Sequence, residues 1–233
     1  MGEGRSHGAV LGPAMRVVVA VLGVLAALAG IEHGVGEVVQ GPVAPPGIVF
    51  ESWPDSAAFE LLGGEPALTV IPNLLVSGIL TVIVASALLI WAVWGVHRMY
   101  GGLLLIGLSV LLLVVGGGFG PPLLGLILGV AAAWTPAPAD PNGLTRVLAK
   151  AWPWALTAAV AGYVGLVPGM LILAVVWEES PDALTYGLMV LAFGGLLVAV
   201  AGARASDRMR AWKDRPVPVR PSPTPHPGRA EAH

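Results

Sequence analysis

The sequence predicts an all-α, polytopic membrane helix bundle with about six transmembrane helices. Hydrophobic residues make up 56% of the 233 residues and charged residues only 11%, against roughly half and one quarter in a soluble domain. Several apolar runs approach the ~17 to 25 residues that a helix needs to cross ~30 Å of hydrocarbon. Every Lys and Arg also falls on one side of a six-span topology, which orients the chain.

Helices are expected because a helix satisfies its own backbone groups where no water can. The expected spans are 15–38, 68–95, 100–116, 121–134, 152–177 and 183–203. They form a bundle over 15–203, between an N-terminal segment, 1–14, and a basic, proline-rich tail, 204–233, that is predicted to be disordered. The first apolar run also fits a cleaved signal peptide, but its helical pattern continues past the small residues "ALA" at 27–29, which favours an uncleaved span.

The third and fourth spans are joined by "VVGGGFGPPLL", which contains no charged residue. Its glycines and prolines are strong helix breakers. We therefore predict a tight Gly/Pro hairpin of two short helices. A re-entrant segment over 116–134 is the alternative, and in both cases the chain returns to the side from which it came.

The loop 41–67 is the longest between spans. The stretch "GPVAPPGIVF" should be extended because prolines disfavour helix before them. In "SWPDSAAFELLGG", Ser52 and Asp55 have the spacing of a helix cap, and Gly63 is placed to end a short helix. That helix would either lie on the bilayer surface or cap the bundle.

The distribution of charge predicts the orientation. The twelve basic residues are Arg5, Arg16, Arg98, Arg146, Lys150, Arg204, Arg208, Arg210, Lys213, Arg215, Arg220 and Arg229. All lie on the side that the positive-inside rule makes cytoplasmic, so both termini are expected there. The opposite side carries nine of the fourteen acids, namely Glu32, Glu37, Glu51, Asp55, Glu60, Glu65, Glu178, Glu179 and Asp182. The composition, rich in Ala, Gly, Val and Pro, further suggests a bacterial inner membrane.

The first span ends in "LAGIEHGVGEVVQG", which places Glu32, His33 and Glu37 in its outer third. Glu32 lies about 24 Å along the helix from Arg16, at 1.5 Å per residue. His33 and Glu37 are four residues apart and share a face, which Gln40 extends, while Glu32 points about 100° away. The glycines in this stretch allow another helix to approach closely.

Facing groups are expected from other spans. Asn73, Ser77 and Thr81 recur every four residues in the second span, although the two hydroxyls are more simply interpreted as bonded to their own helix. Glu178 and Glu179 should arrive at the same depth from the fifth span, whose Pro168 and Gly169 predict a kink. The candidate ion- or proton-binding residues are therefore Glu32, His33, Glu37, Gln40, Asn73, Glu178 and Glu179.

An ionised carboxylate at membrane depth costs several kcal/mol unless it is paired, and no Arg or Lys is expected on that side. This leaves three hypotheses. In the first, the centre binds a proton or cation during coupled transport of a small solute. In the second, His33 and Glu37 ligate a divalent metal ion. In the third, the acids reach water and the chain is a non-catalytic accessory or structural subunit.

The sequence also limits other functions. It has no cysteine, which excludes disulfides and thiolate chemistry. No nucleophile elbow, phosphate-binding loop or haem-suited histidine pair is present, so an enzyme acting on lipid is only a third expectation. The expected partners are the lipid bilayer and a membrane-protein partner or second copy of the chain, with no nucleic acid.

Overall fold

The computed structural model describes residues 11–54, 59, 63–134, 142–169, 172 and 182–215. The main helices are α1 (Pro13–Gln40), α2 (Leu74–Ile90), α3 (Gly101–Val115), α4 (Gly120–Ala133), α5 (Gly143–Val164), α7 (Asp182–Met189) and α8 (Gly195–Lys213). Three π-helical turns extend them, η2 (Trp91–Gly95), η3 (Gly165–Gly169) and η4 (Val190–Gly194). Two short strands, β1 (Val49–Glu51) and β2 (Pro66–Leu68), pair antiparallel. The regular secondary structure of the described residues is therefore helical apart from this pair of strands.

Three helices among the described residues are long and apolar enough to cross a membrane, Pro13–Gln40, Leu74–Gly95 and Ala183–Lys213. Gly101–Val115 and Gly120–Ala133 are apolar but shorter. The fold is thus that of a membrane helix bundle, as the composition predicts, whereas the number of crossings stays a prediction. At 1.5 Å per residue, α3 is only about 22 Å long, less than the ~30 Å of hydrocarbon.

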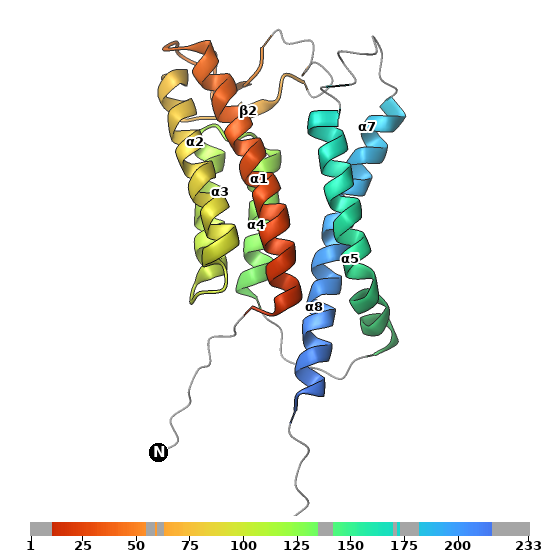
Figure 1. The fold of residues 1–233 in the computed structure, drawn as a ribbon. Helices are drawn as coiled ribbons and strands as arrows, with labels where there is room; N and C mark the ends of the chain where they lie inside the picture. Colours follow the sequence, from red (N-terminus) through yellow and green to blue (C-terminus); the bar gives the residue numbers. More distant parts are fainter. Residues whose placement is uncertain are drawn as a thin grey trace, which may run out of the picture.

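Helix α1 occupies the middle of the molecule. Figure 1 shows it with α2, α3 and α4 on one side and α5, α7 and α8 on the other. Its contact with α2 is backbone to backbone, because a Cβ on Gly34 would lie 2.9 Å from the Gly78 carbonyl oxygen and a Cβ on Gly78 would lie 2.5 Å from that of Gly34. The close approach expected from the glycines of the first span is confirmed at this crossing.

Helices α3 and α4 form the predicted tight hairpin, with the turn at residues 116–119. Gly116 and Gly118 have φ of 120° and 72°, a region that side chains other than glycine rarely adopt. The turn lies against Glu37 and His33 of α1. Glycine is therefore required in this turn both for its positive φ and because a side chain would collide with α1.

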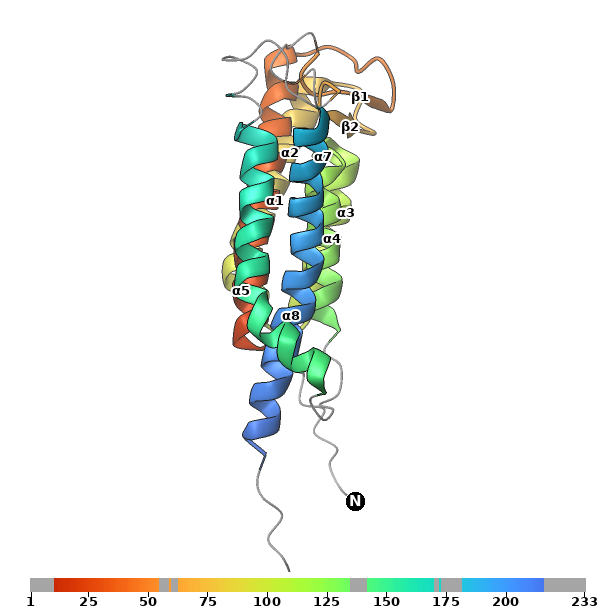
Figure 2. The same ribbon diagram turned by 90° about the vertical axis from the view of Figure 1, so that its right-hand side faces the viewer.

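The β-hairpin covers the same end of the bundle, which we call the hairpin end (Figure 2). An additional bridge joins Thr69 to Val115 at the end of α3. The predicted start of the second span, at residue 68, is wrong, because Pro66–Leu68 is a strand and α2 begins at Leu74. The expected extended conformation before residue 50 is consistent with β1, but the pairing of β1 with β2 was not anticipated.

At the opposite end, which we call the basic end, α8 continues to Lys213. The tail was predicted to be disordered from residue 204, and this is wrong for residues 204–213, which belong to α8. Two side chains of α8 hold this end by capping other helices: Asp207 accepts hydrogen bonds of 3.0 Å from the N–H groups of Ala14 and Met15, and Arg204 donates bonds of 2.8 and 2.9 Å to the carbonyls of Ala131 and Trp134. These bonds satisfy groups that helix ends leave unpaired.

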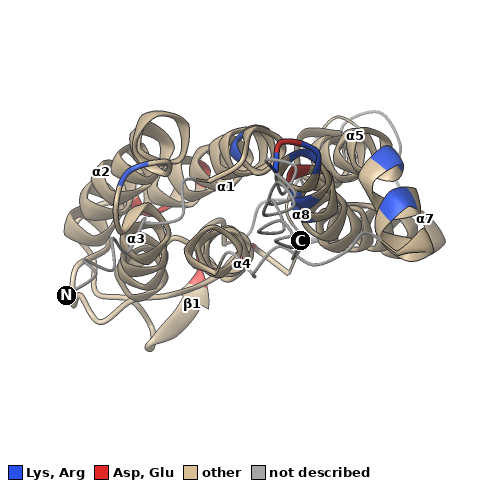
Figure 3. Ribbon diagram, turned by 90° about the horizontal axis from the view of Figure 1, so that it is seen from below, with Lys and Arg blue, Asp and Glu red and all other residues tan. Residues whose placement is uncertain are grey.

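Lys and Arg gather at this basic end, where α1 begins and α8 ends (Figure 3). Helix α5 begins at Gly143, earlier than the predicted 152, with Asn142 as its N-cap. The π-helical turn η3 contains Pro168, so the backbone departs from regular α-helix where the kink was predicted, as proline requires. The predicted span ends at 177, beyond the described residues.

Candidate functional site

His33 is the centre of the polar group at the hairpin end. Its side chain is 2% exposed. The Nδ1 atom lies 2.9 Å from the Ser52 hydroxyl, and Nε2 lies 2.7 Å from Oε2 of Glu65. With Nε2–H donating to Glu65, Nδ1 accepts from Ser52 in the neutral ring or donates to it in the protonated ring. Both ring nitrogens are thus occupied, and the ring is fixed between α1 and the loop 41–67.

Glu65 reaches His33 from an unfavourable backbone conformation. Its φ is 56°, in the left-handed region, which costs a non-glycine residue on the order of 1 kcal/mol or more. Gly63 and Gly64 before it also have positive φ, so the turn into β2 is left-handed for three residues. This turn contacts α1 through the ion pair of Glu65 with His33.

Glu32 lies beside His33 but has a different partner. The indole N–H of Trp53 donates to one of its carboxylate oxygens, and the other oxygen is buried without a partner among the described residues. Trp53 stacks on Phe59, with ring centroids 5.1 Å apart, and Phe59 is buried. Residues 55–58 and 60–62, where the short helix was predicted, lie outside the described part, so whether that helix caps the bundle or lies on the bilayer surface stays a prediction.

Glu37 is the most deeply buried charged residue in the described chain, with an exposed fraction of 0%. The Ser77 hydroxyl is close enough to influence its carboxyl group, but within the part of the chain that the structure describes neither carboxyl oxygen has a partner with hydrogen-bond geometry. A Cβ on Gly116 would lie 2.0 Å from its Oε1, and a Cβ on Gly118 would lie 2.2 Å from Nε2 of His33. The glycine turn between α3 and α4 therefore makes room for both side chains.

The neighbouring hydroxyls are turned toward the end of α3. Ser77 and Thr81 donate to the carbonyl oxygen of Val115 over 2.6 and 2.7 Å. Thr69 and Ser77 are 2.7 Å apart, and because the Ser77 hydrogen goes to Val115, Thr69 must be the donor of that pair. The interpretation of Ser77 and Thr81 as bonded to their own helix is wrong. The three hydroxyl hydrogens are all used, and none is left for Glu37.

Two further predicted site residues have structural partners. The amide nitrogen of Gln40 donates to the carbonyls of Ser52 and Glu51 over 2.9 and 3.2 Å, which ties the end of α1 to β1. The Asn73 side chain accepts from the N–H of Val76 over 3.1 Å and caps α2. Glu178 and Glu179 lie outside the described residues.

The residues that approach metal-ligand geometry differ from the predicted pair of His33 and Glu37. One donor atom each from Glu32, His33 and Glu65 lies within 4.8 Å of the others. An imidazole with two carboxylates is a donor set that suits a divalent transition metal. Glu37, one helical turn further along α1, is not part of this group.

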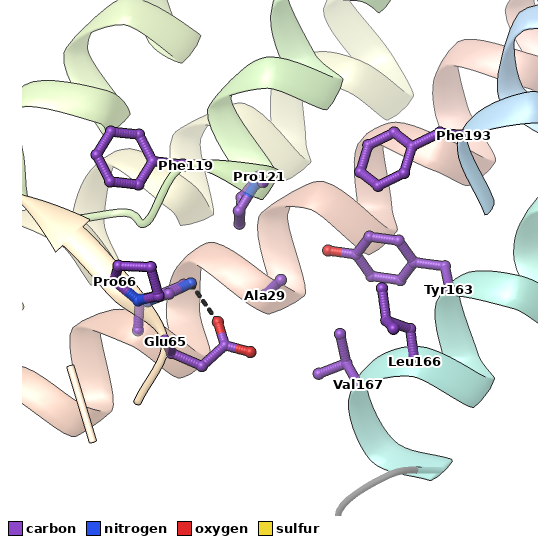
Figure 4. A pocket seen from close by; sticks show the side chains of 11 residues that line it. Ala29, Glu65, Pro66, Phe119, Pro121, Tyr163, Leu166, Val167 and Phe193 are labelled. Atoms are coloured by element: carbon purple, nitrogen blue, oxygen red, sulfur yellow. Dashed lines mark ion pairs between the residues drawn. The ribbon is translucent and has the colours of Figure 1, made fainter. Parts of the chain in front are cut away.

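A cavity of about 130 Å³ opens beside His33 and Glu65. Figure 4 shows its walls: Phe119 stands on one side, Tyr163 and Phe193 on the other, and the ion pair at one end. The cavity is bounded by α1, the start of β2, the beginning of α4, the end of α5 with η3, and η4. It therefore lies between the two groups of helices that flank α1.

Ser52, Trp53, Glu65 and Tyr163 are site residues that the sequence did not reveal. Glu65 was recognised only as one of nine acids on this side. Ser52 was interpreted as a helix cap, and its bond to His33 spans nineteen residues. The signal in the sequence was the scarcity of basic residues, because with none between Arg16 and Arg98, His33 is one of the few groups there that can offset an acid; it did not identify which acid.

Comparisons with protein-family models, with curated proteins and with solved structures gave no match to this chain.

Proposed function

We propose that this chain couples transport of a small solute to binding of a proton or cation by the polar centre of α1. In this proposal the chain crosses a bacterial inner membrane about six times, with the basic end and both termini in the cytoplasm. The one-sided distribution of Lys and Arg supports that orientation. Glu37, His33 and Glu65 would then lie toward the outer face.

The observation that carries the proposal is the environment of Glu37. Its carboxyl group is completely buried, and neither oxygen has a partner with hydrogen-bond geometry among the described residues. An unpaired charge in such surroundings costs several kcal/mol or more. Since the sequence has no Lys or Arg between Arg16 and Arg98, and His33 is paired with Glu65, the compensating charge in this proposal is a proton or a cation from solution.

The hydrogen-bond pattern favours the same ligands. Ser77 is the hydroxyl beside the Glu37 carboxyl group, and its hydrogen is directed to the carbonyl oxygen of Val115, so it offers Glu37 a lone pair. A protonated carboxyl could donate to such a lone pair, and a cation could be held by lone pairs and the carboxylate together. An ionised carboxylate alone would gain nothing from them. The polar surroundings are thus suited to a neutralised Glu37.

Purified protein in lipid vesicles that contain a pH-sensitive or a Na⁺-sensitive dye provides the test. Under an imposed gradient, the wild type should carry a proton or Na⁺ flux that Glu37→Gln abolishes. Gln keeps the shape of the side chain, so the loss would report the carboxyl group itself.

Glu51→Gln is the matched control, because Glu51 is an exposed acid on β1 at the same end. It should retain the flux of the wild type. A flux that survives Glu37→Gln unchanged, or that both substitutions reduce equally, would exclude Glu37 as the coupling group.

A second candidate function is divalent metal binding by Glu32, His33 and Glu65. The specific observation in its favour is the bond between Nδ1 of His33 and the Ser52 hydroxyl. With Nε2 on a metal, Nδ1–H would donate to Ser52, and metal-bound histidines commonly donate their other ring N–H in this way. Glu32 also has a buried oxygen that no described residue bonds. These residues would supply one imidazole and two carboxylates, and the metal would polarise or hold a ligand at the cavity.

Elemental analysis of the purified protein tests this candidate. About one Zn, Mn or Fe per chain is expected, with loss of the metal in His33→Ala and retention in Glu37→Gln. Wild-type protein that binds none of these metals when they are supplied in excess would refute it.

A further inference from the structure

The cavity beside His33 combines aromatic walls with an acidic end. Phe119, Tyr163 and Phe193 line it, together with apolar residues of α1, α4 and η3. Small-molecule sites are commonly of this kind, mostly apolar with a few convergent polar groups. In Figure 4 the Glu65 carboxylate directs one oxygen to His33 and the other toward the space in front of Tyr163.

The ionisable groups around the cavity carry an acidic excess. His33 can contribute at most one positive charge, whereas Glu65 and the adjacent Glu32 contribute two negative charges when ionised. The sequence supplies no Lys or Arg to this part of α1 or to the loop 41–67. An anionic ligand would therefore be repelled, whereas a cationic ligand, or a proton, would neutralise the excess acid.

From this combination we propose that the cavity binds a small organic ammonium ion. The aromatic faces would contact the alkyl groups around the cationic nitrogen, and Glu65 would supply the opposite charge. The statement that this ammonium ion is the transported solute rests on the proposed function. Binding of the ion to the cavity is measured independently of transport.

The size of the cavity limits the ligand. A cavity of about 150 Å³ in another protein accommodates benzene, so about 130 Å³ suits a cation of about five non-hydrogen atoms, by roughly the same ratio. Tetramethylammonium has this size, and choline would place its trimethylammonium head in the cavity with its hydroxyethyl group at the opening. A larger cation could place only its ammonium head in the cavity.

Choline and its neutral isostere 3,3-dimethylbutan-1-ol test the proposal on the wild-type protein. The two molecules have the same shape, and only choline is charged. Titration calorimetry on the full chain in detergent should give choline at least about tenfold tighter binding, as a partly desolvated cation–π contact allows. Equal affinity for the two molecules, or no binding of choline, would overturn the proposal.

Substitution of the aromatic wall is the second arm. Tyr163→Leu should weaken choline binding at least about tenfold, and Tyr163→Phe, which keeps the ring, should largely preserve it. Tyr186→Leu is the matched control, because Tyr186 is 66% exposed and does not line the cavity. The site is refuted if Tyr186→Leu and Tyr163→Leu weaken binding to the same extent.

Failure of this inference can be distinguished from failure of the proposed function. Glu37 does not line the cavity, so Glu37→Gln should bind choline as the wild type does while losing the proton or Na⁺ flux. Loss of choline selectivity with a Glu37-dependent flux intact would reject only the ammonium site. Selective choline binding with a flux that does not depend on Glu37 would reject only the coupling role.

Discussion

The hydroxyl of Ser52 lies 2.9 Å from Nδ1 of His33, and both side chains are buried, at 0% and 2% exposure. This bond connects α1 to the segment that links β1 to β2, beside the bonds made by Gln40 and Trp53. It also orients the imidazole ring so that Nε2 points to Glu65. The loop 41–67 is therefore part of the polar centre and not only a connection between two helices.

Ser52→Ala should destabilise the protein by roughly 1 to 3 kcal/mol, because a buried ring nitrogen loses its partner. The free energy of unfolding from SDS titration in mixed micelles measures the effect. Ser86→Ala is the control: Ser86 bonds the carbonyl of Val82 in its own helix, and its loss should change stability by less than about 0.5 kcal/mol. A negligible effect at Ser52 would mean that the bond contributes nothing to the fold.

Gly34→Leu should greatly reduce the yield of folded protein. A Cβ at this position would lie 2.9 Å from both the Gly78 carbonyl oxygen and a Val82 methyl group, so α1 and α2 would have to separate. Gly107→Leu, on α3, is the matched control because a Cβ there meets nothing within 4 Å. Size-exclusion chromatography of both variants compares them, and similar monodisperse peaks would show that the α1–α2 contact tolerates a side chain.

Asp207→Ala should lower the thermal stability in detergent, since two N–H groups at the start of α1 lose their acceptor. The expected loss is about 1 to 2 kcal/mol, as for other helix caps. Asp214→Ala, at the exposed end of α8, should have little effect. Equal melting temperatures for Asp207→Ala and the wild type would show that the cap does not hold the two helices together.

Sequence composition was sufficient to predict the membrane helix bundle and the α3–α4 hairpin, because hydrophobic length and glycine are local signals. It was also sufficient to locate the polar centre on α1, where His33 and Glu37 interrupt an apolar run. The end of α8 was mispredicted at 204, since Arg204 and Asp207 look like tail charges until their partners on α1 and α4 are known.

The partners within the site could not be derived in the same way. Ser52 and Glu65 meet His33 through a loop whose left-handed turn at Glu65 has no clear sequence signature. Asn73 has a spacing that suggested a facing group, but Asn is equally suited to cap a helix, and here it does. Tyr163 lines the cavity only because two groups of helices meet beside α1, which is a tertiary arrangement.

The central claim, that Glu37 is neutralised by a proton or a cation, is tested most directly by infrared difference spectroscopy of wild type against Glu37→Gln. The protein should be dialysed against chelator and free of Na⁺. The account predicts a protonated carboxyl band that Glu37→Gln removes, or that added Na⁺ converts to a carboxylate band. A carboxylate band from Glu37 in cation-free protein, at the pH of the flux assay, would contradict it.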